Sequence, residues 1–349
     1  MFKKTFAIFL ILLASACSSK ISNFGSYLPQ EFPKTSFMPN PETVQGKAPK
    51  VVVFELDNGE NEVAKQADLG ESITVALENV LTQNRLAQLV DRKAAKKLEK
   101  EIVLIEMNKT GSYKGPEIAE YAISGSIGNA GFTSKYSSGM VLPTFTGGIT
   151  RVPPSFKYIS DVSGNIKIYE LPSMKVIENI EFAGKKTKKE QVKTNNNISI
   201  GGIIEFGGQK SEGLKRDDGL VRNAGIEAID NISFILKNFF AKKGFISEKR
   251  VLKNKVIFKI SVGRSDGVKS GDRFEVIGKY ETFNALTGED EIESRIIASG
   301  KVADRIDLKS SWVLIDDEDS VNLVRLGDLV RFKYERSFLG KAGKFFSRF

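Results

Sequence analysis

Residues 51–127 alternate between strand and helix patterns, and this stretch constrains the fold more than any other part of the chain. Residues 51–54 are a continuous run of β-branched and aromatic side chains, which is typical of a strand buried on both faces. Apolar residues then recur at helical spacing over 69–81, and a second, Lys/Glu-rich helix is predicted at 91–105. A further strand at 121–127 completes a pattern that predicts a compact α/β unit, with helices packed against one sheet.

The residue types present in the chain exclude several classes of chemistry. The formal net charge is +9, and the chain has no histidine and one cysteine. Because histidine is absent, neither a Ser-His-Asp triad nor the usual zinc ligand set can form, and one cysteine cannot make an intrachain disulfide. No other grouping of residues resembles a catalytic site. We therefore expect a protein that is not an enzyme and that uses no cofactor or metal.

The N-terminus has the pattern of a secretory signal peptide. Two lysines precede an apolar run at 6–13, which is shorter than the roughly 20 residues of a transmembrane helix. Ala14, Ser15 and Ala16 then lead to Cys17. This order resembles a bacterial lipobox, and the resemblance implies cleavage after residue 16 and lipid attachment at Cys17. Ala14 departs from the usual leucine at its position, and an ordinary secretory leader is the alternative.

Ser18 follows the candidate lipidated cysteine, and a serine at this position resembles outer-membrane sorting. We therefore expect a lipid-anchored protein on the periplasmic face of the outer membrane. The lysine runs are most simply explained as exposed charge, and in that compartment their partners would be anionic lipid or cell-wall polymer, and not nucleic acid. Residues 17–50 are rich in Ser, Pro, Asn and Lys and predict an extended tether. Docking on a neighbouring subunit through the aromatic and proline residues near Tyr27 and Phe32 is the alternative.

Residues 128–210 contain predicted hairpins whose environment the sequence leaves open. Paired strands are predicted at 156–161 and 164–171. Residues 198–206 alternate apolar with small or polar side chains, except at Ile203, over a length that suits a membrane strand. Lysines crowd the opposing strand at 185–193, however, and a charge that faces lipid is costly. Membrane insertion and a soluble hairpin therefore both remain open.

A small β-barrel is predicted after the apolar helical stripe at 220–240. Its short strands recur at regular spacing with glycine-containing turns between them. They are predicted at 255–262, 274–277, 296–306, 311–315 and 329–334. The dipeptide Gly-Asp, which is typical of turns, precedes two of these strands, at Gly271-Asp272 and Gly327-Asp328.

Two clusters in this region could bind ions, and each has a simpler explanation. The glycine-rich loop beside Lys269 and Arg273 could hold phosphate, but it lies between strands and not at a helix N-terminus. The acidic run at 316–319 lacks the alternating ligand spacing of a calcium loop, which favours a solvated turn.

The tail at 337–349 mixes Phe with Lys and Arg, so it could touch a membrane or a partner, or fray. Cys17 is therefore the single residue assigned to a site.

Several phrases of the chain resemble known bacterial families. "VVVFELDNG" at 51–59, "LGESITVALENVLTQNRLAQLVDR" at 69–92 and "YAISGSI" at 121–127 resemble the curli secretion lipoproteins of the CsgG family. "VGRSDGVKSGDRFEV" at 262–276 resembles the C-terminal domain of FlgT-type flagellar assembly proteins. The resemblances imply an α+β chain. A CsgG-like α/β periplasmic domain with extended β-hairpins would be followed by a small SH3-like β-barrel domain.

The predicted organisation has five parts. They are a signal peptide at 1–16, a lipidated N-terminus and linker at 17–50, the CsgG-like domain with hairpin insertions at 51–246, the FlgT-like barrel at 247–336 and the basic aromatic tail at 337–349.

The resemblances imply a homo-oligomeric ring that builds or braces the flagellar basal body and is needed for motility. Its expected partners are other copies of itself, flagellar basal-body or outer-membrane ring proteins, and the membrane through the lipid anchor. A curli-type secretion channel is the alternative function. Such channels have a longer loop after the first strand, with aromatic and amide side chains that narrow the pore. Residues 58–67 are a short segment without an aromatic residue, which favours the flagellar function.

Overall fold

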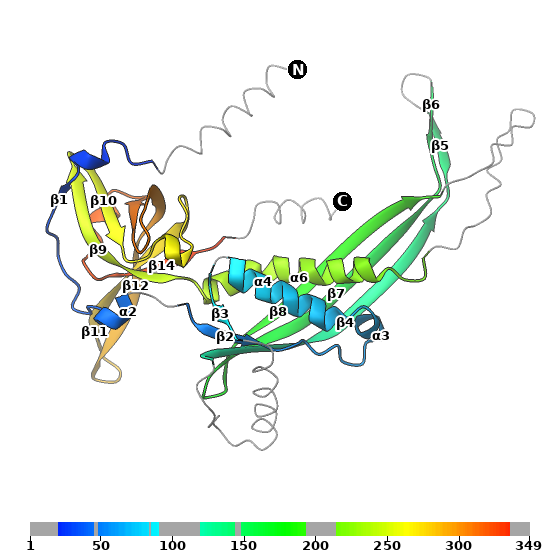
Figure 1. The fold of residues 1–349 in the computed structure, drawn as a ribbon, viewed down its shortest axis with the longest axis horizontal. Helices are drawn as coiled ribbons and strands as arrows, with labels where there is room; N and C mark the ends of the chain where they lie inside the picture. Colours follow the sequence, from blue (N-terminus) through cyan, green and yellow to red (C-terminus); the bar gives the residue numbers. More distant parts are fainter. Residues whose placement is uncertain are drawn as a thin grey trace, which may run out of the picture. The chain divides into compact units, whose positions relative to one another are not determined.

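The computed structural model describes residues 20–44, 48–83, 85–90, 119–143, 148–192 and 214–335. These residues form a mixed α/β structure with mostly strands and few helices, which divides into two compact units (Figure 1). The described residues of 50–80 and 89–234 make the first, which we call the α/β unit. Those of 20–49, 81–88 and 235–335 make the second, the barrel unit.

The α/β unit is built on a five-stranded sheet. In order across the sheet the strands are β3 (Gln88–Leu89), β2 (Lys50–Val53), β4 (Tyr121–Ser137), β7 (Ser155–Glu170) and β8 (Lys175–Gln191). β2 is parallel to β4, whereas β4 and β8 are antiparallel to β7. The predicted buried strand is confirmed, because Val51 and Val52 are fully buried.

Beyond the short β2, strands β4, β7 and β8 continue as a long three-stranded ribbon (Figure 1). A small antiparallel hairpin, β5 (Met140–Pro143) with β6 (Ile149–Val152), connects β4 to β7 where the ribbon ends.

Two helices, α4 (Leu69–Gln83) and α6 (Asp218–Phe239), lie against the sheet (Figure 1). The apolar stripe predicted for 69–81 is confirmed, since Leu69, Ile73 and Leu77 are fully buried. The stripe of α6 is confirmed in the same way by Val221 and Ala228. Helical spacing of apolar residues was therefore a reliable guide to both helices, because each buries one face.

Glycine allows the layers of the α/β unit to approach closely. A Cβ added to Gly184 on β8 would lie 2.2 Å from the carbonyl oxygen of Ala224 and 2.4 Å from the backbone nitrogen of Ala228, both on α6. Real Cβ atoms do not approach backbone this closely, so only glycine fits at position 184. The packing of α6 on the sheet thus depends on one missing side chain.

The prediction of two paired strands at 156–161 and 164–171 is wrong, because these residues form one continuous strand, β7. The two residues between the predicted strands, Val162 and Ser163, belong to this strand and pair with β8, opposite Gly184 and Ala183. A Cβ on Gly164 would lie 2.3 Å from the carbonyl oxygen of Ser126 and 2.6 Å from the Phe182 ring. The glycine is therefore explained by close packing within the sheet.

The barrel unit contains a closed six-stranded barrel, which confirms the prediction of a small β-barrel. Its strands are β9 (Lys243–Leu252), β10 (Lys255–Ile260), β13 (Ser311–Ile315), β12 (Glu289–Ile306), β11 (Arg273–Asn284) and β14 (Leu329–Lys333), and β14 pairs with β9 to close the cylinder. All the pairings are antiparallel. The interior is filled by buried residues that include Phe258, Phe274 and Phe332.

Two features of the barrel differ from the predicted strands. β9 starts at Lys243, before the predicted boundary at 247, and it holds the barrel closed by pairing with both β10 and β14. β11 and β12 are longer than predicted, because they extend as a paired ribbon from Ile277↔Ile296 to Asn284↔Glu289. Most side chains of this extension are exposed, so it lacks the alternation of buried and polar residues by which a strand is recognised.

The prediction of an extended tether at 17–50 is wrong for the described residues 20–39, which pack on the barrel. They include a 3₁₀ turn, η2 (Phe24–Ser26), and a short strand, β1 (Leu28–Pro29), that pairs with β9. Ile21 and Tyr27 are buried in one cluster with Trp312. The segment has too few apolar residues to fold alone, but the barrel supplies the remaining surface. A short helix, α2 (Pro41–Val44), follows.

Several predictions lie outside the described residues. These are the lipid attachment at Cys17, the helix at 91–105, the strand at 198–206 and the tail at 337–349.

Candidate functional site

The segment after β2 is the place where the curli resemblance locates pore-narrowing side chains, and here it folds onto the sheet. Its central turn is helix α3 (Glu62–Gln66). Asn61 caps this helix by accepting a hydrogen bond from the Ala64 N–H at 2.9 Å, and its Nδ2 donates to the Ala130 carbonyl of β4 at 3.1 Å. Ala64 and Ala67 are fully buried. The segment is therefore held by the Asn61 side chain and by two buried alanines.

The two Gly-Asp dipeptides of the barrel form the same turn. Gly271 and Gly327 have φ of +87° and +88°, which favour glycine. Asp272 accepts a hydrogen bond through Oδ2 from the Lys269 N–H at 2.9 Å, and Asp328 accepts one from the Arg325 N–H at 2.8 Å. The backbone N–H groups of the two aspartates donate in turn to the carbonyl oxygens of Lys269 and Arg325, at 3.2 Å in both turns.

The turns lead into β11 and β14, which pair with each other. The recurrence seen in the sequence is therefore a repeated device for starting neighbouring barrel strands.

The phosphate hypothesis for the glycine-rich loop does not fit the geometry. Backbone N–H groups that would have to cradle an anion already donate within the protein. Gly263 N–H donates to Asp266 Oδ2 at 2.8 Å, Lys269 N–H to Asp272, and Gly271 N–H to the Val302 carbonyl at 2.8 Å. The loop also contains only a single 3₁₀ turn, η3 (Arg264–Asp266), and no long helix terminus.

The acidic run at 316–319 forms a capped turn. The Asp317 carboxylate accepts hydrogen bonds from the N–H and the hydroxyl of Ser320, at 3.2 and 2.7 Å, ahead of the 3₁₀ helix η4 (Asp319–Leu323). These hydrogen bonds lower the pKa of Asp317. Within the described ranges, no three acidic or cysteine side chains are placed to share a metal ion.

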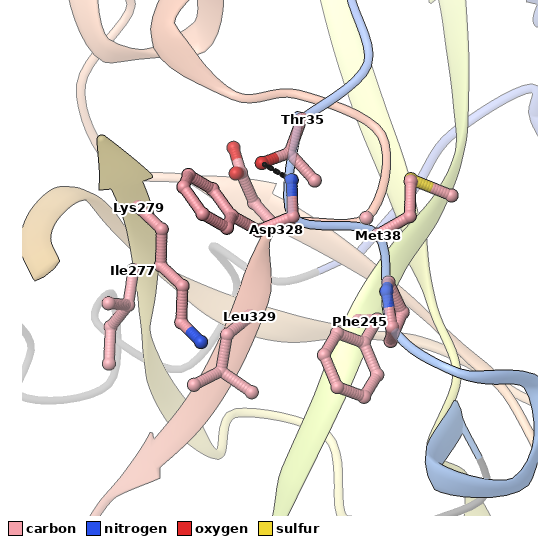
Figure 2. Close-up of a pocket in the computed structure, with 10 residues that line it drawn as sticks. Thr35, Met38, Phe245, Ile277, Lys279, Asp328 and Leu329 are labelled. Carbon is pink, nitrogen blue, oxygen red and sulfur yellow. Dashed lines mark hydrogen bonds between the residues drawn. The ribbon is translucent and has the colours of Figure 1, made fainter. Parts of the chain in front are cut away.

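A hollow of about 380 Å³ lies between the N-terminal segment and the barrel strands (Figure 2). Thr35 and Met38 come from the segment, and Phe245, Ile277 and Leu329 come from β9, β11 and β14. The hollow therefore presents mainly apolar side chains, a surface that suits an apolar group.

Two charged groups border this hollow. Lys279 of β11 extends along its wall (Figure 2). The Asp328 carboxylate is engaged by Arg325, whose Nη2 donates to Oδ1 at 3.0 Å. Burial raises the pKa of Asp328 even though the hydrogen bonds from Arg325 act in the other direction.

Sequence reasoning missed two charged residues of the barrel unit. Glu275 of β11 is buried and accepts hydrogen bonds from Arg331 at 2.9 Å and Lys333 at 2.7 Å, both on β14. Burial alone would raise the pKa of Glu275, but these hydrogen bonds lower it below its usual value. The Glu275–Arg331 pair could be found only from the strand register. Burial lowers the pKa of the second residue, Lys242, to about 8, although the Asp272 and Asp266 carboxylates act against this.

Replacing Lys242 with methionine is expected to stabilise the protein at pH 7 by about 1–2 kcal/mol, because a half-buried ammonium no longer has to be desolvated. An unfolded lysine has a pKa of about 10.4. Between about pH 8 and about pH 10 the unfolded state therefore binds more protons, and the free energy of unfolding of the wild-type protein rises with pH.

The variant should lose this rise, which denaturant titrations over that pH range would measure. Lys243→Met, at the exposed neighbouring position, is the matched control and should keep it. A rise that persists in Lys242→Met would mean that another group causes it.

No family model and no curated protein matches the chain. One solved structure that matches is a PelC dodecamer from Paraburkholderia phytofirmans, at 14% identity and a TM-score of 0.23, over 59% of this chain and 96% of that one. At this TM-score we draw neither fold nor assembly from the likeness. In the part of the chain that the structure describes, the helices lack the length and apolar character needed to cross a membrane.

Proposed function

We propose that this chain is an outer-membrane-associated lipoprotein that forms a homo-oligomeric ring and builds or braces the flagellar basal body. In this proposal the α/β unit is a CsgG-like domain that carries contacts between copies. The barrel is an SH3-like, FlgT-type module that docks on basal-body or outer-membrane ring proteins. A lipid on Cys17 holds the assembly on the periplasmic face of the outer membrane.

The observation that carries this proposal over a secretion channel is the segment after β2. A selective channel needs side chains that project and narrow the pore. Here Asn61 caps α3 and donates to the Ala130 carbonyl, and the alanines at 64 and 67 are buried. The exposed side chains of the segment, at 60, 62, 65 and 66, are charged or amide and include no aromatic residue. The flagellar assignment further rests on the resemblance at 262–276, whose Gly-Asp turn starts a barrel strand. A curli-type channel is the second candidate.

The test is a deletion strain. Loss of the protein should impair swimming, and cryo-tomography of the motors should lack density near the outer-membrane rings. A strain that carries Cys17→Ala should lose incorporation of labelled fatty acid and release the protein from the outer-membrane fraction. Normal motors and normal swimming, together with a secreted substrate trapped in the periplasm, would favour the channel instead.

A further inference from the structure

Three lysines from neighbouring strands form one row across the ribbon of the α/β unit. The strand register places Lys135 of β4 opposite Lys157 of β7, and Lys157 opposite Lys189 of β8. We call these residues the lysine row. Adjacent strands lie about 5 Å apart and directly opposed side chains point to the same face, so three ammonium groups share one narrow band. All three side chains are exposed.

The lysine row lies on the face of the ribbon away from helix α6. Successive side chains of a strand point to opposite faces, and Tyr158, next to Lys157, is buried and accepts a hydrogen bond through its hydroxyl from the Leu214 N–H. Lys186 and Lys188 of β8 share the face of Tyr158 and form ion pairs with Glu227 and Asp217. The protein thus neutralises the β8 lysines of one face with acidic residues near and within α6.

The lysine row is not neutralised in this way. In the described residues, Lys135, Lys157 and Lys189 make no ion pair. Two positions along each strand in either direction, the side chains on the same face form the neighbouring rows, and these rows hold no acidic side chain. Those rows are Thr133, Ile159 and Thr187 on one side and Ser137, Ser155 and Gln191 on the other. Like charges directly opposite each other destabilise a sheet, so three in succession favour the binding of an external anion.

The structure next to the lysine row points to the nature of that anion. β4 leads directly into the β5–β6 hairpin, in which Met140, Leu142, Ile149 and Val152 are exposed by 42–66%. A band of cations followed by exposed apolar side chains matches the order of headgroup and acyl chain in a lipid layer. A soluble polyanion would use the lysines alone and leave the apolar hairpin in water.

We propose that the lysine row binds the phosphate groups of an anionic lipid surface, with the β5–β6 hairpin directed into the layer. This is a membrane contact of the α/β unit that is separate from a lipid on Cys17, and it does not rest on the flagellar function. Because a basic residue near an anionic surface strengthens binding roughly fivefold, the three together should contribute up to about 100-fold. The attraction should weaken with salt.

The test uses the full chain and measures how fast each lysine is acetylated, by mass spectrometry. The probes are vesicles of phosphatidylcholine, vesicles of equal phosphatidylcholine and phosphatidylglycerol, inorganic phosphate, and soluble polyphosphate. We expect acetylation of the three lysines of the row to slow several-fold in the presence of the anionic vesicles, and not with the other three probes. Lys167 and Lys175, which are exposed on the same sheet, should keep their rates. This readout is specific to each residue, so an anchor elsewhere does not confuse it.

A matched pair of triple variants provides a second measurement. Lys135→Gln, Lys157→Gln and Lys189→Gln should remove the salt-sensitive part of binding to anionic vesicles, whereas Lys167→Gln, Lys175→Gln and Lys215→Gln remove the same charge and should preserve it. The proposal fails if the row reacts equally with neutral and anionic vesicles, or if both triple variants weaken binding alike. Slower acetylation with polyphosphate but not with vesicles would overturn it in favour of a soluble polyanion.

Discussion

Replacing Leu77 with aspartate is expected to unfold the α/β unit. Leu77 is fully buried on the face of α4 that packs on the sheet. A carboxylate at this position would be desolvated without a partner, which costs about 4 kcal/mol or more, a large fraction of the total stability of a typical domain. The folded protein should be lost from cells, and purified material should lack a cooperative unfolding transition for this unit.

Val75→Asp is the matched control, because Val75 lies on the same helix with 40% of its surface exposed. An aspartate at this exposed position should lower the free energy of unfolding by about 0.5 kcal/mol. If both variants accumulated and unfolded alike, α4 would not bury the face described here.

The second large effect is expected from adding a single methyl group at Gly184. A Cβ there would lie 2.2 Å from the Ala224 oxygen and 2.4 Å from the Ala228 nitrogen, and both are backbone atoms that cannot rotate away. Helix α6 would have to move off the sheet, and we expect Gly184→Ala to destabilise the α/β unit by about 3 kcal/mol, as overpacking of a dense core does. Denaturant unfolding of the full chain would measure this.

Gly128→Ala is the control for this prediction. Gly128 lies on β4 of the same sheet, and the nearest atom to an added Cβ is the Ser163 oxygen at 3.8 Å, an ordinary contact. The free energy of unfolding of Gly128→Ala should differ from that of the wild-type protein by less than about 1 kcal/mol. Equal effects of the two substitutions would contradict the close packing of α6 on β8.

The parts of the fold that could be predicted are those in which one face of an element is buried. The stripes of α4 and α6, the buried strand β2 and most barrel strands follow from apolar spacing, because burial selects residue type at each position. β7 was divided wrongly at 162–163, because local sequence does not show whether a strand ends or continues through small residues such as Ser163 and Gly164, which here pack within the sheet. The β11–β12 ribbon was missed because its exposed residues carry no burial signal.

The lysine row shows a different limit. The sequence identified the lysines at 185–193 as a dense group, yet it could not divide them between the two faces of the ribbon. Only the register pairs Lys189 with Lys157 and Lys135, and only the position of α6 explains why Lys186 and Lys188 find acidic partners. Local patterns predict elements, whereas a surface assembled from three strands depends on pairings that are distant in the chain.

A lipid on Cys17 would be joined to the barrel unit by very few residues. Ile21 is fixed in the barrel by burial and by its N–H, which donates to Asp304 Oδ1 at 3.0 Å. The chain from Cys17 to Ile21 can reach about 14 Å when fully extended. A force that pulls the protein away from the membrane would therefore act first on the contacts of Ile21 and Tyr27 with Trp312, and then on the β1–β9 pairing. The height of the barrel above the membrane would be set by this packing and not by the length of a loose linker.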